Sequence, residues 1–380
     1  MKKGLSIIAL MSITGQVNAQ HVGFGSITNG ADDCPSGPPE VYRVSNLNDS
    51  GSGSFRDSVS EGCTRVEFDV GGSINLTSTL RIANSFITID GSTAPSPGIT
   101  LNVPGQRLVI EAENRVAVHD VIVTFIRAVG NGQQIETKDI WELDGSSGAP
   151  IYNIILDHLT MTASSDGSVD MYGDVYNVTL SNSLLTDNLL SQHYSESSSA
   201  RDAITVYRNV YARNNERQPK IRYNTTRVDY VNNVVYGWGW MEAGASGLFL
   251  RVGGSQYSPS GNIENNIYHY VPGLNGSPDN ALKIEGTLFG AWYFNGNQWP
   301  LGENDAISTS GQVNIPVVYQ VTRLPVSTLG DAVIPCAGTH FPTASELQLL
   351  GTISQAIGGV GGICNPAAPV PLAPTELRTD

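Results

Sequence analysis

The sequence predicts an all-β solenoid in which short parallel strands stack rung upon rung. Its first support is a recurring pattern of asparagines flanked by short apolar runs, as in Tyr152-Asn-Ile-Ile-Leu156. The intervals between these asparagines are 24 residues from Asn153 to Asn177, 27 from Asn182 to Asn209, 24 from Asn209 to Asn233 and 33 from Asn233 to Asn266. A loose period in the twenties is typical of a coiled repeat architecture.

The second support is composition, because Val, Ile, Leu and Tyr strands alternate with Gly, Ser and Asn turns. In such a coil, inward asparagine side chains can hydrogen-bond to their counterparts on the rungs above and below. A β-sandwich of many short strands is the alternative, since it would also be rich in Gly, Ser and Asn. No obvious hairpin meander pairs these segments, which favours the solenoid.

The first 19 residues have the pattern of a secretory signal peptide. Lys2 and Lys3 precede an apolar run from Leu5 to Ile13, and small residues end at Ala19. The apolar run is too short to span a bilayer. Cleavage after Ala19 would remove these two lysines and change the formal net charge from -14 to -16. We expect a secreted protein, extracellular or periplasmic, with no membrane or nucleic-acid partner and a monomeric state.

Four cysteines fall into two widely separated pairs in this exported chain. The spacing favours one bridge between Cys34 and Cys63 and another between Cys336 and Cys364. Other pairings, or four free thiols, remain possible at this point.

One domain is expected over residues 20–364, because a solenoid grows by adding rungs. Within residues 53–62, Phe55 and Val59 have helical spacing, as in a short helix that covers the open end of a coil. Residues 365–380 are expected to be a Pro-rich linker followed by the start of a truncated further module, which predicts that the chain is part of a longer modular protein.

A basic cluster stands out against the acidic whole. Seven of the 21 basic residues lie within residues 201–227, against only Asp202 and Glu216. The densest part is Arg217-Gln-Pro-Lys220-Ile-Arg222. Such a cluster in an acidic chain indicates short-range capture of an anionic group, although a solvated basic face is the plain alternative.

Three aspartates are candidates for a hard-cation site. Asp166 and Asp170 are four residues apart in a loop that runs into a strand, and Asp139 opens the strand one rung earlier. Calcium takes carboxylate and carbonyl oxygens with loose geometry. Turn-capping aspartates are the alternative. The sequence contains no EF-hand loop, zinc pattern or phosphate-binding loop.

Seven segments carry sequence motifs, at residues 23–25, 44–54, 68–72, 87–95, 156–158, 217–222 and 228–238. In this order they resemble the pectate lyase family, family 1 of the polysaccharide lyases, in a divergent branch. The resemblance covers roughly residues 22–275. It implies a right-handed parallel β-helix with capped ends, and β-elimination on a uronic-acid polysaccharide such as pectate.

The resemblance also implies roles for individual residues. Arg217 matches the catalytic base of the family, and Arg222 matches the arginine that pairs with the substrate carboxylate. The three aspartates, Asp139, Asp166 and Asp170, match the calcium-binding acids.

The sequence departs from the family at one position. The substrate-binding lysine expected one rung before the arginines falls near Leu190, where His193 is the only obvious polar replacement. His193 or Tyr223 could also serve as the base in place of Arg217. Lys220 and Arg127 are further candidates for carboxylate binding. This departure leaves the substrate open between pectate and an algal or animal uronan.

Two other functions are compatible with a secreted solenoid. A glycoside hydrolase on the same fold needs paired acids, but the only Asp-Asp pair, Asp32-Asp33, lies in the N-terminal cap, and no Gly-His-Gly occurs. A non-catalytic β-helix adhesin or carbohydrate-binding module would explain secretion, solenoid and basic cluster. It would not need the Arg-x-Pro-x-x-Arg spacing.

Overall fold

A computed structural model describes residues 21–132, 138–194, 200–251, 259–287, 290–302 and 305–361. The signal peptide, Cys364 and the Pro-rich linker with the truncated module lie outside the described residues. Within them, no helix combines the length and apolar character needed to cross a bilayer.

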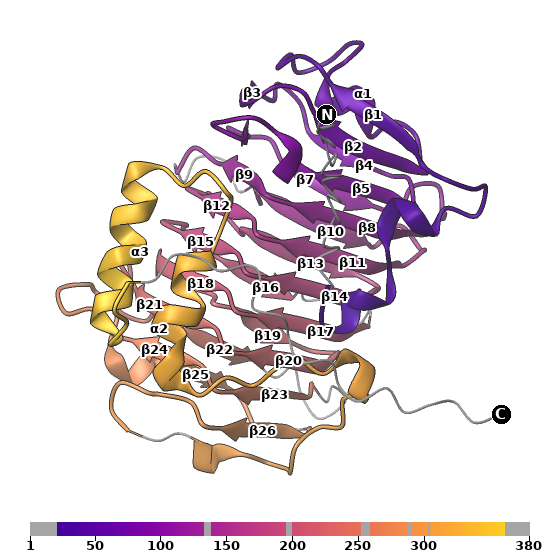
Figure 1. Cartoon of the computed structure of the whole chain (residues 1–380). Coiled ribbons are helices and arrows are strands. Elements are labelled where there is room, and N and C mark those ends of the chain that lie inside the picture. The colour runs from indigo at the N-terminus through magenta and orange to yellow at the C-terminus, as the bar shows by residue number, and fades with distance from the viewer. Residues whose placement is uncertain are drawn as a thin grey trace, which may run out of the picture.

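The chain forms a coil of three parallel sheets (Figure 1). Sheet A contains β1 (Glu40–Val44), β2 (Thr64–Phe68), β5 (Ile87–Asp90), β8 (Val118–Thr124), β11 (Ile151–Asp157), β14 (Val175–Ser181), β17 (Arg201–Tyr207), β20 (Thr225–Val231), β23 (Gly261–Glu264) and β26 (Trp292–Asn295). Sheet B contains β3 (Gly72–Asn75), β6 (Ile99–Asn102), β9 (Ile126–Val129), β12 (Thr160–Thr162), β15 (Leu184–Thr186), β18 (Val210–Asn214), β21 (Val234–Trp238) and β24 (Ile267–His269). Sheet C contains β4 (Leu80–Ile82), β7 (Leu108–Glu111), β10 (Trp141–Gly145), β13 (Val169–Gly173), β16 (Gln192–Tyr194), β19 (Lys220–Arg222), β22 (Leu248–Arg251) and β25 (Leu282–Glu285).

Each full turn of the coil adds one strand to sheet A, one to sheet B and one to sheet C. Along sheet A, Ile154, Val178, Ile204 and Val228 are consecutive register partners, and all four are buried. Every pairing between the named strands is parallel. The parallel solenoid is confirmed, and the β-sandwich is excluded because its strands would pair antiparallel.

The helices are short and lie outside the coil. They are α1 (Phe55–Ser58), α2 (Leu329–Ala332) and α3 (Ala344–Ala356), with 3-10 turns η1 (Phe24–Ile27), η2 (Gly30–Asp33), η3 (Gly91–Thr93), η4 (Pro278–Ala281), η5 (Asp305–Ile307), η6 (Val317–Tyr319), η7 (Val326–Thr328) and η8 (Ile334–Cys336).

A buried asparagine ladder holds successive rungs together. The Nδ2 of Asn209 donates to Asn233 Oδ1 at 3.1 Å, Asn233 to Asn266 at 3.2 Å, and Asn266 to Asn297 at 2.9 Å. The expected ladder is therefore present for these four, whereas Asn153 and Asn177 bond to each other at 3.0 Å in a half-buried position and Asn182 does not belong to the ladder. Asn182 instead donates to Asp157 Oδ1, because its left-handed backbone (φ 48°) places it at a corner of the coil.

The N-terminal end of the coil is covered as the sequence predicts. Phe55 of α1 and the following Val59 are buried in the main core, beside the first strands (Figure 1). Cys34 and Cys63 form a disulfide with a sequence separation of 29 residues. Cys336 is also disulfide-bonded, and its expected partner Cys364 lies outside the described residues, so that pairing stays a prediction.

We expect the double variant Cys34→Ser/Cys63→Ser to lose about 3 to 4 kcal/mol of unfolding free energy, because the bridge closes a 29-residue loop in the unfolded chain. Denaturant unfolding of oxidised wild type and variant measures the difference. An unchanged midpoint would show that the N-terminal cap is held by packing alone.

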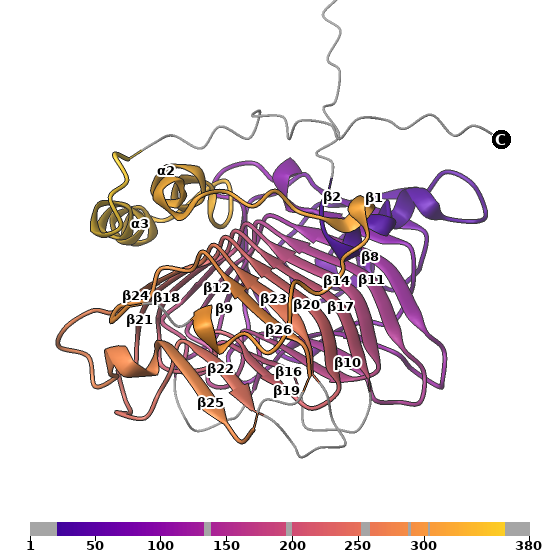
Figure 2. The ribbon, with the colours of Figure 1, turned by 90° about the horizontal axis from the view of Figure 1, so that it is seen from below.

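The coil ends at β26, and the chain then returns along the outside. Leu349, Leu350 and Ile353 of α3 pack against the outer side of sheet B, on Leu184 and Val210. Figure 2 shows α2 and α3 beside sheet B and away from sheet C. The C-terminal part of the expected β-helix domain is thus an outer layer, and sheet C is left free of helices in the described structure.

Candidate active site

The outward face of sheet C carries a ladder of polar side chains in strand register. In the register of neighbouring strands, Glu142 lies opposite Asp170, Asp170 opposite His193, and His193 opposite Lys220. Neighbouring strands lie roughly 4.8 Å apart, so these side chains form one continuous row. The residues between them, such as Leu143, point inward and are buried. This alternation is why the sequence places acids and bases on one face.

The connections from sheet B to sheet C supply the other candidate residues. Asp139 precedes β10, Asp166 lies between β12 and β13, and Arg217 lies between β18 and β19. Because successive rungs stack in register, these connections line the same edge of sheet C. Residues far apart in the sequence therefore meet beside the ladder.

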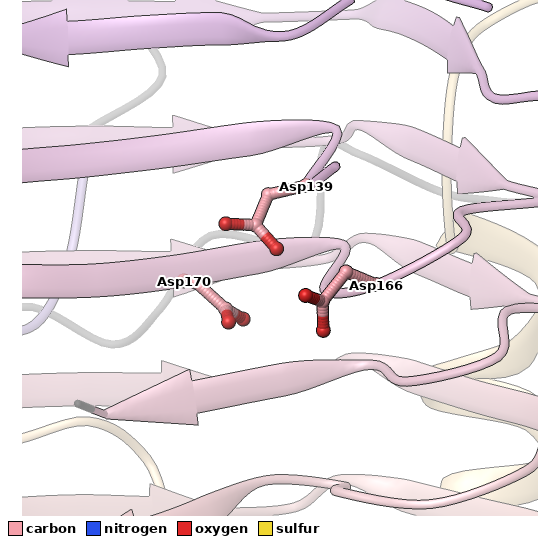
Figure 3. A group of neighbouring side chains, drawn as sticks. All are labelled: Asp139, Asp166 and Asp170. Atoms are coloured by element: carbon pink, nitrogen blue, oxygen red, sulfur yellow. The ribbon is translucent and has the colours of Figure 1, made fainter. Parts of the chain in front are cut away.

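Three carboxylates converge at this edge, as Figure 3 shows. One oxygen each from Asp139, Asp166 and Asp170 lies within 4.8 Å of the other two. Asp139 Oδ1 accepts the backbone N–H of Gly167 at 2.8 Å, and Asp170 Oδ1 accepts that of His193 at 2.8 Å. Backbone donors thus hold two of the three acids in place.

The acids strongly disfavour one another's charged forms. Burial, followed by the Asp166 carboxylate, raises the pKa of Asp139 to about 7. Burial, followed by Asp139, raises the pKa of Asp170 well above its ordinary value. Burial raises the pKa of Asp166, although Arg217 opposes the shift. A bound cation would remove this repulsion.

The residues present fit a hard cation. The donors are all oxygens, which calcium prefers. Gly167 leaves room that a side chain would fill, because a Cβ there would lie 2.0 Å from Asp170 Oδ1. Tyr172 contributes a further oxygen, with its hydroxyl 3.4 Å from Asp170 Oδ2 and 3.5 Å from Asp139 Oδ2.

The cations lie directly beside the acids. Arg217 Nη1 is 3.6 Å from Asp166 Oδ1, and the Arg217 side chain keeps 21% exposure. Its Nε is buried and has no hydrogen-bond partner in the described structure. Lys220 places its Nζ 4.5 Å from the ring centroid of Phe249. Among the described residues, no carboxylate forms a salt bridge with Lys220.

Arg222 is more enclosed than the sequence suggested. It is only 2% exposed. Its Nη2 donates to Tyr223 Oη at 3.1 Å, and its Nη1 lies 3.4 Å from His193 Nε2. Arg222 therefore lies beside His193 and Tyr223 with very little of its surface open to solvent.

His193 joins the acidic and basic halves of the ladder. Its Nδ1 is 3.9 Å from Asp170 Oδ2, and its Nε2 faces Arg222. Burial, then Arg217 and Lys220, lower the pKa of His193 to about 2. The imidazole is therefore neutral. Burial and Arg217 also lower the pKa of Lys220 to about 8.

Arg127 does not belong to this site. It lies on β9 of sheet B and is only 6% exposed. Its Nε and Nη2 bind the carboxylate of Glu346 on α3 at 3.1 and 2.7 Å. The structure therefore does not bring Arg127 to the outward face of sheet C, where the other candidate residues meet.

Four residues of the site were missed from the sequence: Glu142, Gly167, Tyr172 and Phe249. Glu142 and Tyr172 could have been found from strand alternation, since each lies two residues from another outward position. Gly167 could have been suspected from its place between two aspartates. Nothing in the sequence marks Phe249.

The chain is similar to known proteins over much of its length. No protein-family model matches the chain. A probable pectate lyase C of Aspergillus flavus is 32% identical over 264 residues, covering 69% of this chain and 58% of the relative. One of Aspergillus oryzae is 33% identical over 238 residues, covering 62% and 51%. The chain thus spans between half and three-fifths of the length of these relatives.

Solved structures show the same fold. The cedar pollen allergen jun a 1 superposes with a TM-score of 0.60 at 18% identity, covering 81% of this chain and 90% of the allergen. A pectate lyase from Bacillus sp. N165, solved in complex with trigalacturonate, gives 0.55 at 16% identity, covering 83% and 98%. The chain is therefore a homologue of the pectate lyases and has the parallel β-helix fold of their solved structures.

Proposed function

We propose that the protein is a secreted lyase that cleaves a uronic-acid polysaccharide, pectate or a close relative, by β-elimination. The observation that carries the proposal is that the outward side of sheet C divides into an acidic half and a basic half, with Asp166 and Arg217 partly exposed between them. Asp166 and Arg217 meet at the boundary, 3.6 Å apart. A uronic-acid polymer needs groups that neutralise its carboxylates and a base that removes a proton from the sugar. The residues at this boundary could supply the neutralising groups and the base.

The reaction assigns roles to the chain's own residues. Arg217 takes the proton from C5 of the uronate. The C5–H electron pair forms the C4–C5 double bond, and the C4–O4 bond breaks with its electrons moving to oxygen. That oxygen then takes a proton from water, so the products are an unsaturated chain end and a new hydroxyl end. Lys220, Arg222 and His193 bind and orient the uronate.

The acidic cluster is proposed to bind Ca²⁺ through Asp139, Asp166 and Asp170. When bound, calcium would stabilise the negative charge that builds up beside the uronate carboxylate. The aspartates would also orient Arg217 through its contact with Asp166. Trigalacturonate, bound in the Bacillus sp. N165 structure, is an acidic oligosaccharide of the kind that these residues would take.

The alternative base His193 is disfavoured by its environment. With a pKa lowered to about 2, it is a poor proton acceptor, and its two nitrogens already face Asp170 and Arg222. Its proposed role remains to bind and orient the uronate, together with Lys220 and Arg222. Arg217 is better placed as the base because its side chain is partly exposed beside the acids.

The test is absorbance at the unsaturated-uronate band during incubation with a panel of polymers: polygalacturonate, alginate and glycosaminoglycans. Absorbance that rises with polygalacturonate supports the proposal, and a rise only with another polymer reassigns the substrate. Binding without any absorbance change would instead favour the non-catalytic carbohydrate-binding module.

We expect Arg222→Lys to lower kcat/KM by about tenfold or more, because lysine keeps the charge but loses the planar fork. In the structure this fork faces Tyr223 and His193 at once. Steady-state kinetics on polygalacturonate measure the effect, and Arg251→Lys on the next rung is the matched control. Equal kinetics in Arg222→Lys and wild type would move carboxylate recognition to Lys220.

A further inference from the structure

In the described structure, the C-terminal end of the coil is covered on sheets A and B. On sheet A, Trp292 N of β26 donates to Thr309 Oγ1 at 2.9 Å, and Thr309 N donates back to Trp292 O at 2.9 Å. On sheet B, Tyr268 N of β24 donates to Gln298 O at 2.9 Å, and the Tyr268 ring stacks on Trp299 at 4.3 Å between centroids. Sheet C ends at β25, and no further strand of the described structure pairs with its outer edge (Figure 2).

The buried apolar row inside sheet C loses its cover at this last strand. Consecutive register partners in the row are Met171, Tyr194, Ile221, Leu250 and Ile284. The first four are at most 1% exposed, whereas Ile284 is 38% exposed. The earlier residues are covered by the rung that follows each of them, and Ile284 has no following rung on its sheet. An exposed apolar side chain on an unpaired strand edge is a typical place for pairing with another strand.

The charges on β25 decide which strand could pair there. Charged residues on an edge strand often prevent pairing, and Lys283 and Glu285 flank Ile284 on this edge. Their signs are opposite, however, and they stand symmetrically about Ile284. If two copies of β25 pair antiparallel with Ile284 at the centre, Lys283 stands opposite the partner's Glu285, and Glu285 stands opposite the partner's Lys283. Opposite charges in directly facing positions stabilise a strand pair, and like charges destabilise it.

Both charged side chains are accessible for such contacts. The Lys283 side chain is 37% exposed, and the Glu285 side chain is 49% exposed. Glu285 Oε2 lies 3.1 Å from Arg251 Nε, and Lys283 Nζ donates to Gly244 O at 3.2 Å and lies 3.9 Å from Glu216 Oε1. An ammonium group has three donors and a carboxylate has about four acceptor sites. Each side chain can therefore keep its contacts within the chain and add one across the interface.

We propose that β25 pairs antiparallel with β25 of a second copy of this chain, so that the two C sheets join edge to edge in a symmetric dimer. The interface is of the isologous kind, in which the same residues face each other across a two-fold axis. An edge of four residues is small, so the dimer is weak and forms as protein concentration rises. The monomeric state expected from the sequence is the alternative. The proposal does not depend on the lyase function.

The first test is sedimentation velocity of the full chain over a range of concentrations. We expect wild type to dimerise, and Lys283→Glu or Glu285→Lys alone to raise the dimer Kd about tenfold or more, because each variant places like charges opposite each other twice. Arg213→Glu and Asp187→Lys are the matched controls, since they reverse the charges of an exposed ion pair on the sheet B side. A monomeric wild type at every concentration, or equal weakening in the controls, would overturn the proposal.

The second test restores the pairing without restoring the wild-type residues. A mixture of the Lys283→Glu and Glu285→Lys variants again places opposite charges at both facing positions, so the two proteins should associate with each other with at least the affinity of wild type. The double variant Lys283→Glu/Glu285→Lys should dimerise with itself for the same reason. Association of this kind also shows that each variant is folded. If neither the mixture nor the double variant regained association, antiparallel pairing through β25 would be excluded.

Discussion

Replacing Arg217 with alanine is expected to lower turnover on polygalacturonate by about 10²- to 10⁴-fold, the usual contribution of a positioned base. The fold should be unaffected, because Arg217 lies in a connection and its side chain is partly exposed. Circular dichroism and the unfolding midpoint check the fold, and absorbance of the unsaturated product measures turnover. Arg213→Ala, one cation on sheet B, is the matched control.

An arginine base is chemically demanding, since a guanidinium normally stays protonated. In the structure, Arg217 Nε is buried without a hydrogen-bond partner among the described residues, and its Nη1 lies 3.6 Å from Asp166 Oδ1. Near-wild-type turnover in Arg217→Ala would remove Arg217 as the base and turn attention to Lys220, whose pKa is lowered to about 8.

The solenoid fold was predictable because its repeat of asparagines and short apolar runs can be recognised in the sequence. Asparagines about 24 residues apart reappear as hydrogen-bonded neighbours such as Asn209 and Asn233. The N-terminal cap was also predictable, since Phe55 and Val59 have helical spacing and are buried. The C-terminal layer could not be predicted, because the position of α3 depends on its packing against Leu184 and Val210, which are far away in the sequence.

The candidate site was only partly predictable. Asp139, Asp166 and Asp170 converge as expected because their connections stack on neighbouring rungs. Arg127 was misplaced since sequence spacing gives the rung but not the sheet. The enclosure of Arg222 (2% exposed) was equally invisible, because burial of an outward residue depends on what the neighbouring rungs place around it.

Removal of calcium is expected to abolish activity, and its return to restore it. Asp139, Asp166 and Asp170 would hold the ion, and without it a strongly acidic chain meets an acidic polymer. Asp170→Asn should raise the calcium concentration needed for half-maximal rate, and Asp187→Asn, an exposed aspartate on the sheet B side, is the control. Full activity in excess EDTA, with Asp166→Asn and Asp170→Asn unaffected, would contradict the calcium assignment.

The same acids give a readout that does not depend on activity. Burial and mutual repulsion raise the folded-state pKa of Asp139 to about 7, above the value near 3.9 of an unfolded aspartate. The folded state then binds more protons, so without metal this group costs stability as pH rises from about 4 to 7. Calcium should therefore raise Tm most above pH 7, by an amount equivalent to about 2.7 kcal/mol at a hundredfold excess over Kd.

Asp170→Asn removes one of the repelling charges, so the metal-free variant should be at least as stable as metal-free wild type at pH 8. The variant should also lose the rise in Tm that calcium produces. A lower Tm for metal-free Asp170→Asn would contradict the view that repulsion among the acids destabilises the metal-free protein.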